Sequence, residues 1–188
     1  MVDDTADDEA GTGAGLGQQP VLVVMGVSGS GKTTVARLVA TRLGWDMAEG
    51  DDLHPEANVA KMAAGHPLTD ADRWPWLHRV AAWIAEHTRA GRPGVITCSA
   101  LRRSYRDLLR GDHVVFVDLV GDREQIRGRL AARHGHYMPT SLLDSQFATL
   151  EPPDPDEHAL EVDVAGTPSE IAAEVIVRLG LRSTPPGE

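Results

Sequence analysis

A glycine-rich stretch near the N-terminus carries the residue types that bind the phosphates of a nucleotide. Residues 26–33 match the pattern G-x-x-x-x-G-K-S/T. Glycines let a backbone curl tightly, so that its N–H groups can approach a polyphosphate. In this pattern the Lys32 amine reaches the β and γ phosphates, and the Thr33 hydroxyl is a ligand for Mg²⁺. We therefore predict an ATP site formed by the following residues: Gly26, Ser28, Gly29, Ser30, Gly31, Lys32, Thr33 and Thr34.

The residues on either side of this loop support the prediction. Five apolar residues, 21–25, precede it and are typical of a buried strand in a parallel sheet. Apolar residues at helical spacing follow it, from Val35 to Leu43. The N-terminus of that helix directs its positive end at the same anion. This strand–loop–helix context is more specific than the pattern alone, for which a plain glycine-rich turn is the alternative.

The acidic segment 49–54, which follows a short candidate strand, offers a carboxylate for phosphoryl transfer. A carboxylate near the attacking hydroxyl can orient it and accept its proton, and we assign this role to Asp51. The alternative is that Asp51 or Asp52 only caps the following helix. His54 is a candidate substrate contact, although a histidine before a proline is often only a turn residue. Dedicated metal-ligand spacing is absent from the four nearby candidates: Asp51, Asp52, His54 and His66.

Arginines that could bind an anionic ligand follow the predicted strand 95–98. A guanidinium fork suits carboxylates and phosphates. Arg102 lies closest to the strand end and is the predicted ligand contact, whereas Arg103 and Arg106 also fit a solvated basic helix face. A second group, between Arg123 and Arg133, precedes a glycine-containing loop.

An arginine of this second group could stabilise the charge that develops on a transferred γ-phosphoryl group. A loop carrying such arginines would close after ATP binds and exclude water, which is a competing acceptor. Four arginines on one helix cannot all face ATP, so some of them must be surface residues. Arg129 and Arg133 lie nearest the loop, and we predict that these two serve the nucleotide. Trp74, Trp76 and Trp83 are predicted to be core or helix-packing residues.

Strands and helices alternate along the chain, which indicates βαβ units and a parallel sheet with helices on both faces. In such sheets ligands bind at the carboxyl ends of the strands. The predicted strands are residues 21–25, 45–48, 95–98, 114–119 and 160–164. The first predicted helix follows the loop at residues 26–33, which we call the P-loop. The other predicted helices cover residues 56–64, 70–90, 101–110, 122–132, 141–150 and a terminal segment from 168, and Thr69 is the predicted N-cap of the helix 70–90.

Composition limits the remaining possibilities. The chain has 188 residues and a net charge of -10, which argues against a nucleic-acid-binding surface. Residues 1–19 read as a disordered acidic tail, 20–182 as one kinase domain with a lid at about 133–150, and 183–188 as a C-terminal tail. We expect no signal peptide and no membrane span. The single cysteine, Cys98, fits a reducing cytoplasm and a core position.

Several stretches together resemble the gluconokinase family. The similarity covers roughly residues 20–180, and its middle and Ser-Ala-Leu motifs are much more specific than the P-loop. The stretches that carry it are 26–33, 50–55, 67–77, 98–107, 135–139, 145–147 and 150–152. Tyr137 stands where the family often has phenylalanine, and Arg102 where lysine is common.

The resemblance implies a thermoresistant-type gluconokinase. The implied fold is that of a P-loop NTPase, a nucleoside-monophosphate-kinase-like three-layer sandwich with a parallel sheet flanked by helices and a small lid. The implied reaction converts ATP and D-gluconate to ADP and 6-phospho-D-gluconate, with Mg²⁺, in a cytoplasmic homodimer that feeds the pentose phosphate pathway. Carried over by position, the resemblance implies these roles: Lys32 and Thr33 on phosphates and Mg²⁺, Asp51 as the base, His54, Arg73, Arg102 and His136 on gluconate, and Arg129 and Arg133 at the lid and nucleotide.

Two alternatives remain open from the sequence. A kinase of the same architecture could act on another small acceptor, such as shikimate or a nucleoside monophosphate, although the motifs at 51–54 and 99–103 argue against this. A nucleotide-binding switch protein would need a guanine-specifying Asn-Lys-x-Asp, which the chain lacks. An assay across acceptors separates these readings.

Overall fold

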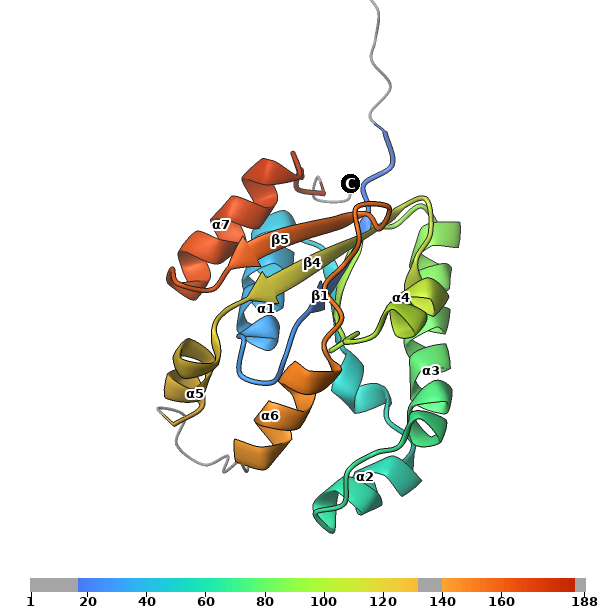
Figure 1. The fold of residues 1–188 in the computed structure, drawn as a ribbon. Helices are drawn as coiled ribbons and strands as arrows, with labels where there is room; N and C mark the ends of the chain where they lie inside the picture. Colours follow the sequence, from blue (N-terminus) through green and yellow to red (C-terminus); the bar gives the residue numbers. More distant parts are fainter. Residues whose placement is uncertain (1–16, 132–139, 185–188) are drawn as a thin grey trace, which may run out of the picture.

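The structure is a computed structural model that describes residues 17–131 and 140–184. Within these residues one sheet of parallel strands has the order β2-β3-β1-β4-β5 (Figure 1). β1 is therefore central, and its carboxyl end lies between those of β3 and β4. The strands are β1 (Val21–Met25), β2 (Asp46–Glu49), β3 (Gly94–Thr97), β4 (Val114–Val120) and β5 (Ala159–Asp163).

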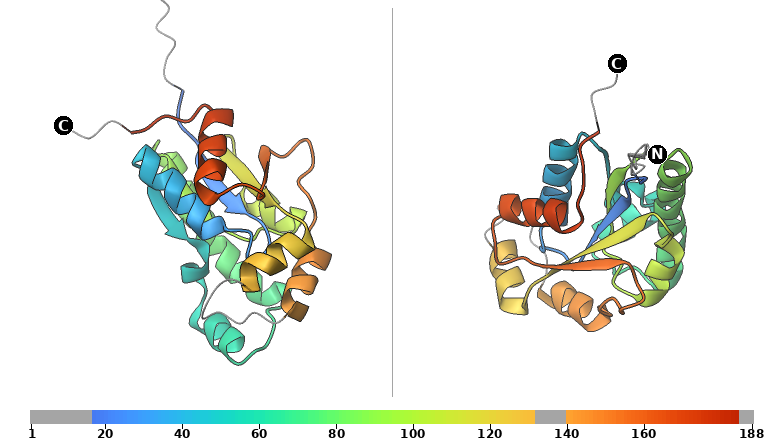
Figure 2. Two further views of the ribbon diagram at one scale, coloured as in Figure 1. Left: turned by 90° about the vertical axis from the view of Figure 1, so that its left-hand side faces the viewer. Right: turned by 90° about the horizontal axis from the view of Figure 1, so that it is seen from above.

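Helices cover both faces of the sheet (Figure 2). On one face α1 (Lys32–Leu43) packs beside α7 (Pro168–Arg178), and on the other α3 (Asp70–Arg89) packs beside α4 (Arg103–Leu109). The remaining elements are the 3₁₀ helix η1 (Gly50–Leu53), α2 (Glu56–Ala63), α5 (Arg123–Ala131) and α6 (Thr140–Thr149). The three-layer arrangement predicted from the alternating pattern is confirmed.

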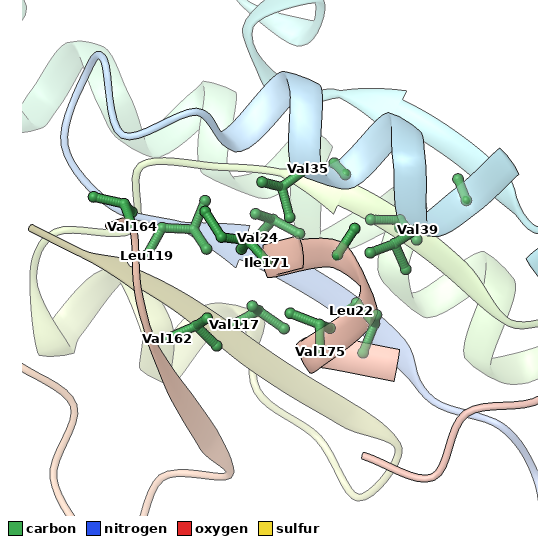
Figure 3. Packing of buried hydrophobic residues seen from close by; sticks show 14 of the residues in the cluster. Leu22, Val24, Val35, Val39, Val117, Leu119, Val162, Val164, Ile171 and Val175 are labelled. Atoms are coloured by element: carbon green, nitrogen blue, oxygen red, sulfur yellow. The ribbon is translucent and has the colours of Figure 1, made fainter. Parts of the chain in front are cut away.

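The central strand divides its side chains between two cores because successive residues of a strand point to opposite faces. Leu22 and Val24 pack against the α1–α7 side, as Figure 3 shows, among Val35 of α1 and Ile171 of α7. The other residues of β1 pack against the α3–α4 side. A strand buried on both faces must be apolar throughout, which explains the uninterrupted apolar run before the P-loop.

The sheet and the helix boundaries agree with the sequence analysis apart from small shifts. β2, β3 and β5 are each shifted by one residue from the predicted ranges, and β4 ends one residue later than predicted. Thr69 is the N-cap of α3, and a reciprocal hydrogen bond with Asp72 forms a capping box. In the described ranges no helix is both long and apolar enough to cross a membrane.

The start of α4 departs from its predicted position by two residues. α4 starts at Arg103 and not at residue 101, because Ala100 has a φ of 44° and Arg102 is extended. A non-glycine residue with positive φ is strained and persists only where its surroundings hold it. The extended backbone leaves Arg102 just before the helix, at the carboxyl edge of the sheet.

A buried ion pair holds this strained segment. The side chains of Arg106 and Glu157 are both fully buried, and Arg106 Nε lies 2.6 Å from Glu157 Oε1. The same guanidinium donates from Nη1 to the carbonyl oxygens of Ala100, at 3.0 Å, and Glu151, at 2.9 Å. Burial alone would raise the pKa of Glu157, but hydrogen bonds from Arg106 and from the Asp154 N–H outweigh it and hold the pKa below its usual range. Arg106 thus fastens the segment before α4, the chain after α6 and the loop before β5.

We predict that Glu157→Gln lowers the free energy of unfolding by about 3–5 kcal/mol, because it leaves the Arg106 charge buried without its counter-ion. Urea denaturation at neutral pH measures this loss. The matched control is Asp156→Asn, which removes an exposed carboxylate from Arg103 nearby and should cost much less. Equal losses in the two variants would contradict a special role for the buried pair.

Candidate active site

The P-loop joins the carboxyl end of β1 to the N-terminus of α1. Gly29 has a φ of 84°, and an added Cβ would lie 2.5 Å from Leu130 Cγ, so α5 rests directly on the loop. Lys32 Nζ donates to the carbonyl oxygens of Gly26, at 3.0 Å, and Val27, at 3.1 Å. The lysine amine therefore lies against the loop, where the sequence analysis expects phosphates.

The other predicted P-loop residues differ in exposure. Ser30 is fully buried, and its hydroxyl makes no hydrogen bond within the described part of the chain. Gly31 is the N-cap of α1 in a left-handed conformation. Thr34 lies exposed in the first turn of α1. The loop therefore leads directly into the N-terminus of α1, and a helix N-terminus is an arrangement that binds anions.

Glu49 connects the P-loop to the neighbouring strands. Its Oε2 accepts hydrogen bonds from Thr33 Oγ1, at 3.1 Å, and Thr97 Oγ1, at 2.7 Å. Glu49 ends β2, and the sequence analysis gave it no role, although it stands at a strand end beside Asp51. Its position at a strand end could have marked it as a site residue. Its contact with Thr33, however, depends on the order of the strands in the sheet, in which β3 lies between β2 and β1.

These oxygens fit a magnesium ion. Glu49 Oε1 is buried and has no hydrogen-bond partner among the described residues, and Thr33 Oγ1 lies beside the same carboxylate. Mg²⁺ prefers hard oxygen ligands, and it needs only one or two from the protein when phosphates and waters supply the rest. Within residues 17–131 and 140–184, no group of three or more acidic, histidine or cysteine side chains is arranged to hold a metal.

A close backbone contact fixes the turn that carries Asp51. An added Cβ on Gly50 would lie 2.0 Å from the carbonyl oxygen of Thr97, so only glycine fits there. Gly50 also donates its N–H to Thr97 Oγ1, at 3.1 Å, and accepts from Trp76 Nε1, at 2.7 Å. The following residue, Asp51, is exposed. The turn therefore presents the Asp51 carboxylate to solvent from a rigid support.

Asp51 and Lys32 both follow the carboxyl ends of strands, and both lie near enough to Cys98 to influence it. Both charges act on the thiol of Cys98, which directly follows β3. Burial raises the pKa of Cys98 to about 12, so the thiol stays protonated at neutral pH. Cys98 is a buried core residue, as the sequence analysis predicts.

His54 is held as a neutral ring beside Asp51. It stacks on Trp76 with ring centroids 4.3 Å apart, and its Nδ1 lies 3.3 Å from the Asn58 amide nitrogen. Because that nitrogen also donates to the carbonyl oxygen of Asp72, it is a donor, and Nδ1 must accept. Burial lowers the pKa of His54, Asp51 partly offsets this, and Arg73 lowers it further. The neutral ring therefore carries its proton on Nε2.

The two predicted substrate arginines meet at one carboxylate. Asp70 accepts hydrogen bonds from Arg102 Nη1, at 2.8 Å, Arg73 Nη1, at 3.5 Å, and the Tyr105 hydroxyl, at 2.5 Å. The Tyr105 hydrogen bond is the main cause that lowers the pKa of Asp70, and Arg102 adds to it. Asp70 begins the predicted helix 70–90, and its position in the sequence gave no indication that it joins the two arginines. We refer to Asp51, His54, Arg73 and Arg102 as the acceptor cluster.

All three tryptophans make packing contacts, in keeping with the prediction that they are core or helix-packing residues. Trp76 is buried, but it also holds Gly50 and stacks on His54. Trp83 stacks on His87 with ring centroids 3.7 Å apart. Trp74 is 36% exposed and lies edge-on to Tyr105, so it borders the acceptor cluster and is not a core residue.

The basic residues around the loop separate into different roles. Arg129 donates to the carbonyl oxygens of Val164 and Gly166 and lies beside Gly31 of the P-loop. Arg123 and Arg127 instead pair with Asp144 of α6, which fits the expectation that some of this group are surface residues. Arg133 and His136 lie outside the described residues, as does the rest of the predicted lid up to residue 139.

Gln146 on α6 contacts the P-loop directly, which the sequence analysis did not foresee. Its Oε1 accepts from the Ser28 backbone N–H at 2.6 Å, and its Nε2 donates to Ser28 Oγ at 3.2 Å. The two residues are 118 positions apart in the chain, so no local sequence signal could have paired them.

Comparisons with known proteins give a consistent picture. A family model described as an AAA domain matches residues 21–153. A gluconokinase from Gluconobacter oxydans is 53% identical over 164 residues, which cover 86% of this chain and 92% of the relative. An unliganded structure of a sugar kinase from Janibacter is 48% identical, with a TM-score of 0.80 and coverage of 86% and 95% of the two chains. A gluconokinase structure from Sinorhizobium meliloti is 44% identical, with a TM-score of 0.80 and coverage of 87% and 93%.

The stability of the protein should depend on pH through Asp72, the carboxylate that caps α3 and pairs with Lys61 of α2. Hydrogen bonds from Lys61 and Thr69 lower the pKa of Asp72 from 3.8 to about 2. A depressed folded-state pKa contributes stability that is complete above the unfolded value and is lost as the pH falls through the folded value. We predict that the free energy of unfolding of wild type exceeds that of Asp72→Asn near neutral pH, and that this difference shrinks as the pH falls from 3.8 towards 2. Urea titrations at stepwise lower pH measure it, and a constant difference would contradict the assignment.

Proposed function

The chain belongs to the gluconokinase family, and we propose that it transfers the γ-phosphoryl group of ATP to D-gluconate, giving ADP and 6-phospho-D-gluconate. The observation that carries this proposal is the meeting of two sites at one edge of the sheet. The P-loop offers an anion site, and the acceptor cluster offers two arginines, a neutral histidine and a carboxylate. A sugar acid needs such a set, because its carboxylate suits guanidinium groups and its hydroxyls suit polar side chains.

On the nucleotide side, we propose that the backbone of the P-loop and the N-terminus of α1 bind the phosphates. The Lys32 amine then exchanges its hydrogen bonds with the Gly26 and Val27 carbonyls for phosphate oxygens. Arg129 stands next to Gly31 and the turn at Val164, which supports a place at the nucleotide. The role of Arg133 on the transferring group remains a prediction from the sequence.

We propose that Thr33 and Glu49 hold Mg²⁺, since Glu49 Oε1, which has no partner in residues 17–131 and 140–184, and the Thr33 hydroxyl form the hard-oxygen set described above. A bound Mg²⁺ neutralises charge on the β and γ phosphates. Glu49 is in turn positioned by Thr97, so the threonine at the end of β3 supports the same site.

On the acceptor side, we propose that Asp51 orients the attacking hydroxyl of gluconate and accepts its proton. Arg73 and Arg102 bind the carboxylate, and Asp70 keeps both guanidinium groups on one side before substrate arrives. The Nε2–H of neutral His54 donates to a substrate oxygen. His136 remains a predicted substrate contact. Catalysis then depends mainly on positioning two anionic reactants against fixed positive charges.

Three further proposals rest on the family resemblance. We propose a cytoplasmic location, which the buried single thiol supports. We also propose a homodimer, and a product that enters the pentose phosphate pathway.

The proposed activity is tested by measuring ADP release from Mg-ATP with D-gluconate, glucose, shikimate, AMP or no acceptor. We expect stimulation by gluconate alone, because among these acceptors only gluconate has both a carboxylate and a terminal primary hydroxyl. Stimulation by another acceptor instead would overturn the substrate but keep the kinase fold. No stimulation by any of them would overturn the proposed reaction.

We predict that Asp51→Asn lowers kcat by about 10²–10⁴-fold, the range typical of general base catalysis. The affinity for ATP should stay within about twofold of wild type, because Asp51 is proposed to touch the acceptor and not the phosphates. Steady-state kinetics and calorimetric ATP titration separate the two effects. The matched control is Asp52→Asn, a neighbour in the same turn that should retain most of the turnover. A comparable loss of ATP affinity in Asp51→Asn would assign Asp51 to the metal site.

A further inference from the structure

The contact between Gln146 and Ser28 occupies part of the phosphate-binding loop. The Ser28 backbone N–H can only donate, so the Gln146 atom at 2.6 Å must be the amide oxygen. The amide nitrogen then donates to Ser28 Oγ, which fixes the orientation of the side chain. Gln146 is half-buried on α6, so this contact is shielded from solvent on one side.

A carbonyl oxygen in this place competes with a phosphate oxygen. P-loop N–H groups are the donors that cradle a polyphosphate. If a phosphate oxygen approaches the Ser28 N–H, it meets the Gln146 carbonyl oxygen, and two acceptors cannot share that donor without repulsion. A rotation of the Gln146 amide removes this repulsion, because it replaces the accepting oxygen by the NH₂ group, which can donate to the phosphate oxygen.

The position of α6 indicates which phosphate is involved. After Gln146 the chain makes hydrogen bonds beside the acceptor cluster. The Glu151 N–H donates to the Leu101 carbonyl oxygen at 2.7 Å, and Glu151 Oε2 accepts from the Arg103 N–H at 2.6 Å. Leu101 and Arg103 flank Arg102 of the acceptor cluster. Ser28 is thus the P-loop residue joined through α6 to the acceptor side, and the phosphoryl group nearest the acceptor is the terminal one.

We propose that Gln146 recognises the terminal phosphoryl group of ATP and so distinguishes ATP from ADP. Without nucleotide its oxygen holds the Ser28 N–H. With ATP it releases that N–H to a phosphate oxygen and donates its own NH₂ group to the terminal phosphoryl group. ADP lacks this group and leaves the Gln146–Ser28 contact in place. This inference rests on the proposed function only in that the chain binds ATP at the P-loop.

The test compares the dissociation constants of Mg-ATP and Mg-ADP by calorimetry, without any acceptor, in wild type and in Gln146→Glu. Glutamate keeps the length of the side chain and can still accept from the Ser28 N–H, but it has no NH₂ group to donate and it repels a phosphate. We expect the affinity for ATP to fall about tenfold or more relative to that for ADP, as for a lost hydrogen bond to a charged group. Gln146→Met, which keeps the volume without charge or hydrogen bonds, should lower the ATP-to-ADP affinity ratio in the same direction by a smaller factor.

The matched control is Gln125→Glu on the neighbouring helix α5, which makes the same chemical change away from Ser28 and should leave the ratio unchanged. Equal effects on ATP and ADP in both Gln146 variants, or no effect on either, would overturn the inference and leave the proposed reaction standing. The two proposals can also fail the other way round. If the Gln146 variants show the predicted change in the ATP-to-ADP affinity ratio but the protein does not phosphorylate gluconate, only the proposed reaction is overturned.

Discussion

The buried guanidinium of Arg106 is the interaction on which the acceptor side depends. It neutralises Glu157 in a fully buried pair and donates to the backbone at Ala100 and Glu151. A charge in the interior is tolerated only with a counter-ion and satisfied donors, so these three segments cannot separate without exposing an unpaired charge. The strained Ala100 and the extended Arg102 therefore persist because the surrounding ion pair holds them.

A second constraint joins the acceptor side to the nucleotide side. The carboxyl ends of β2 and β3 approach so closely that Gly50 accommodates no side chain against Thr97. Thr97 then holds both Gly50 and Glu49, and Glu49 reaches Thr33 of the P-loop. One hydroxyl thus places the turn that carries the proposed base and the carboxylate of the proposed metal site. Because Thr97 holds both the Gly50 backbone and the Glu49 carboxylate, the separation of these two groups is set before any ligand binds.

The charges of the candidate site are balanced before any ligand binds. The acceptor arginines are not left to repel each other, since Asp70 accepts from both and from Tyr105. His54 stays neutral because burial and Arg73 lower its pKa, so it adds a donor without a further positive charge. If gluconate binds as proposed, its carboxylate replaces solvent beside the ion pairs of Asp70 with Arg73 and Arg102. Binding then avoids the free-energy cost of desolvating two isolated arginines.

The sequence by itself determined the P-loop pattern, the order of strands and helices and the N-cap at Thr69, because each depends on residue types at short, fixed spacing. It also singled out Asp51, His54 and Arg102 by their places after strands, and Arg73 by the family resemblance alone, and the roles of these four residues on a substrate remain predictions. Only the tertiary structure decided the roles of Glu49, Asp70 and Gln146. Their partners come from other elements, and in the case of Gln146 the partner is 118 residues away. It also decided the late start of α4, since a positive φ at Ala100 contradicts local preference and is held by the hydrogen bond that Arg106 donates to the Ala100 carbonyl oxygen. Spacing determines which side chains share an edge of the sheet, whereas packing and buried charge determine which of them touch.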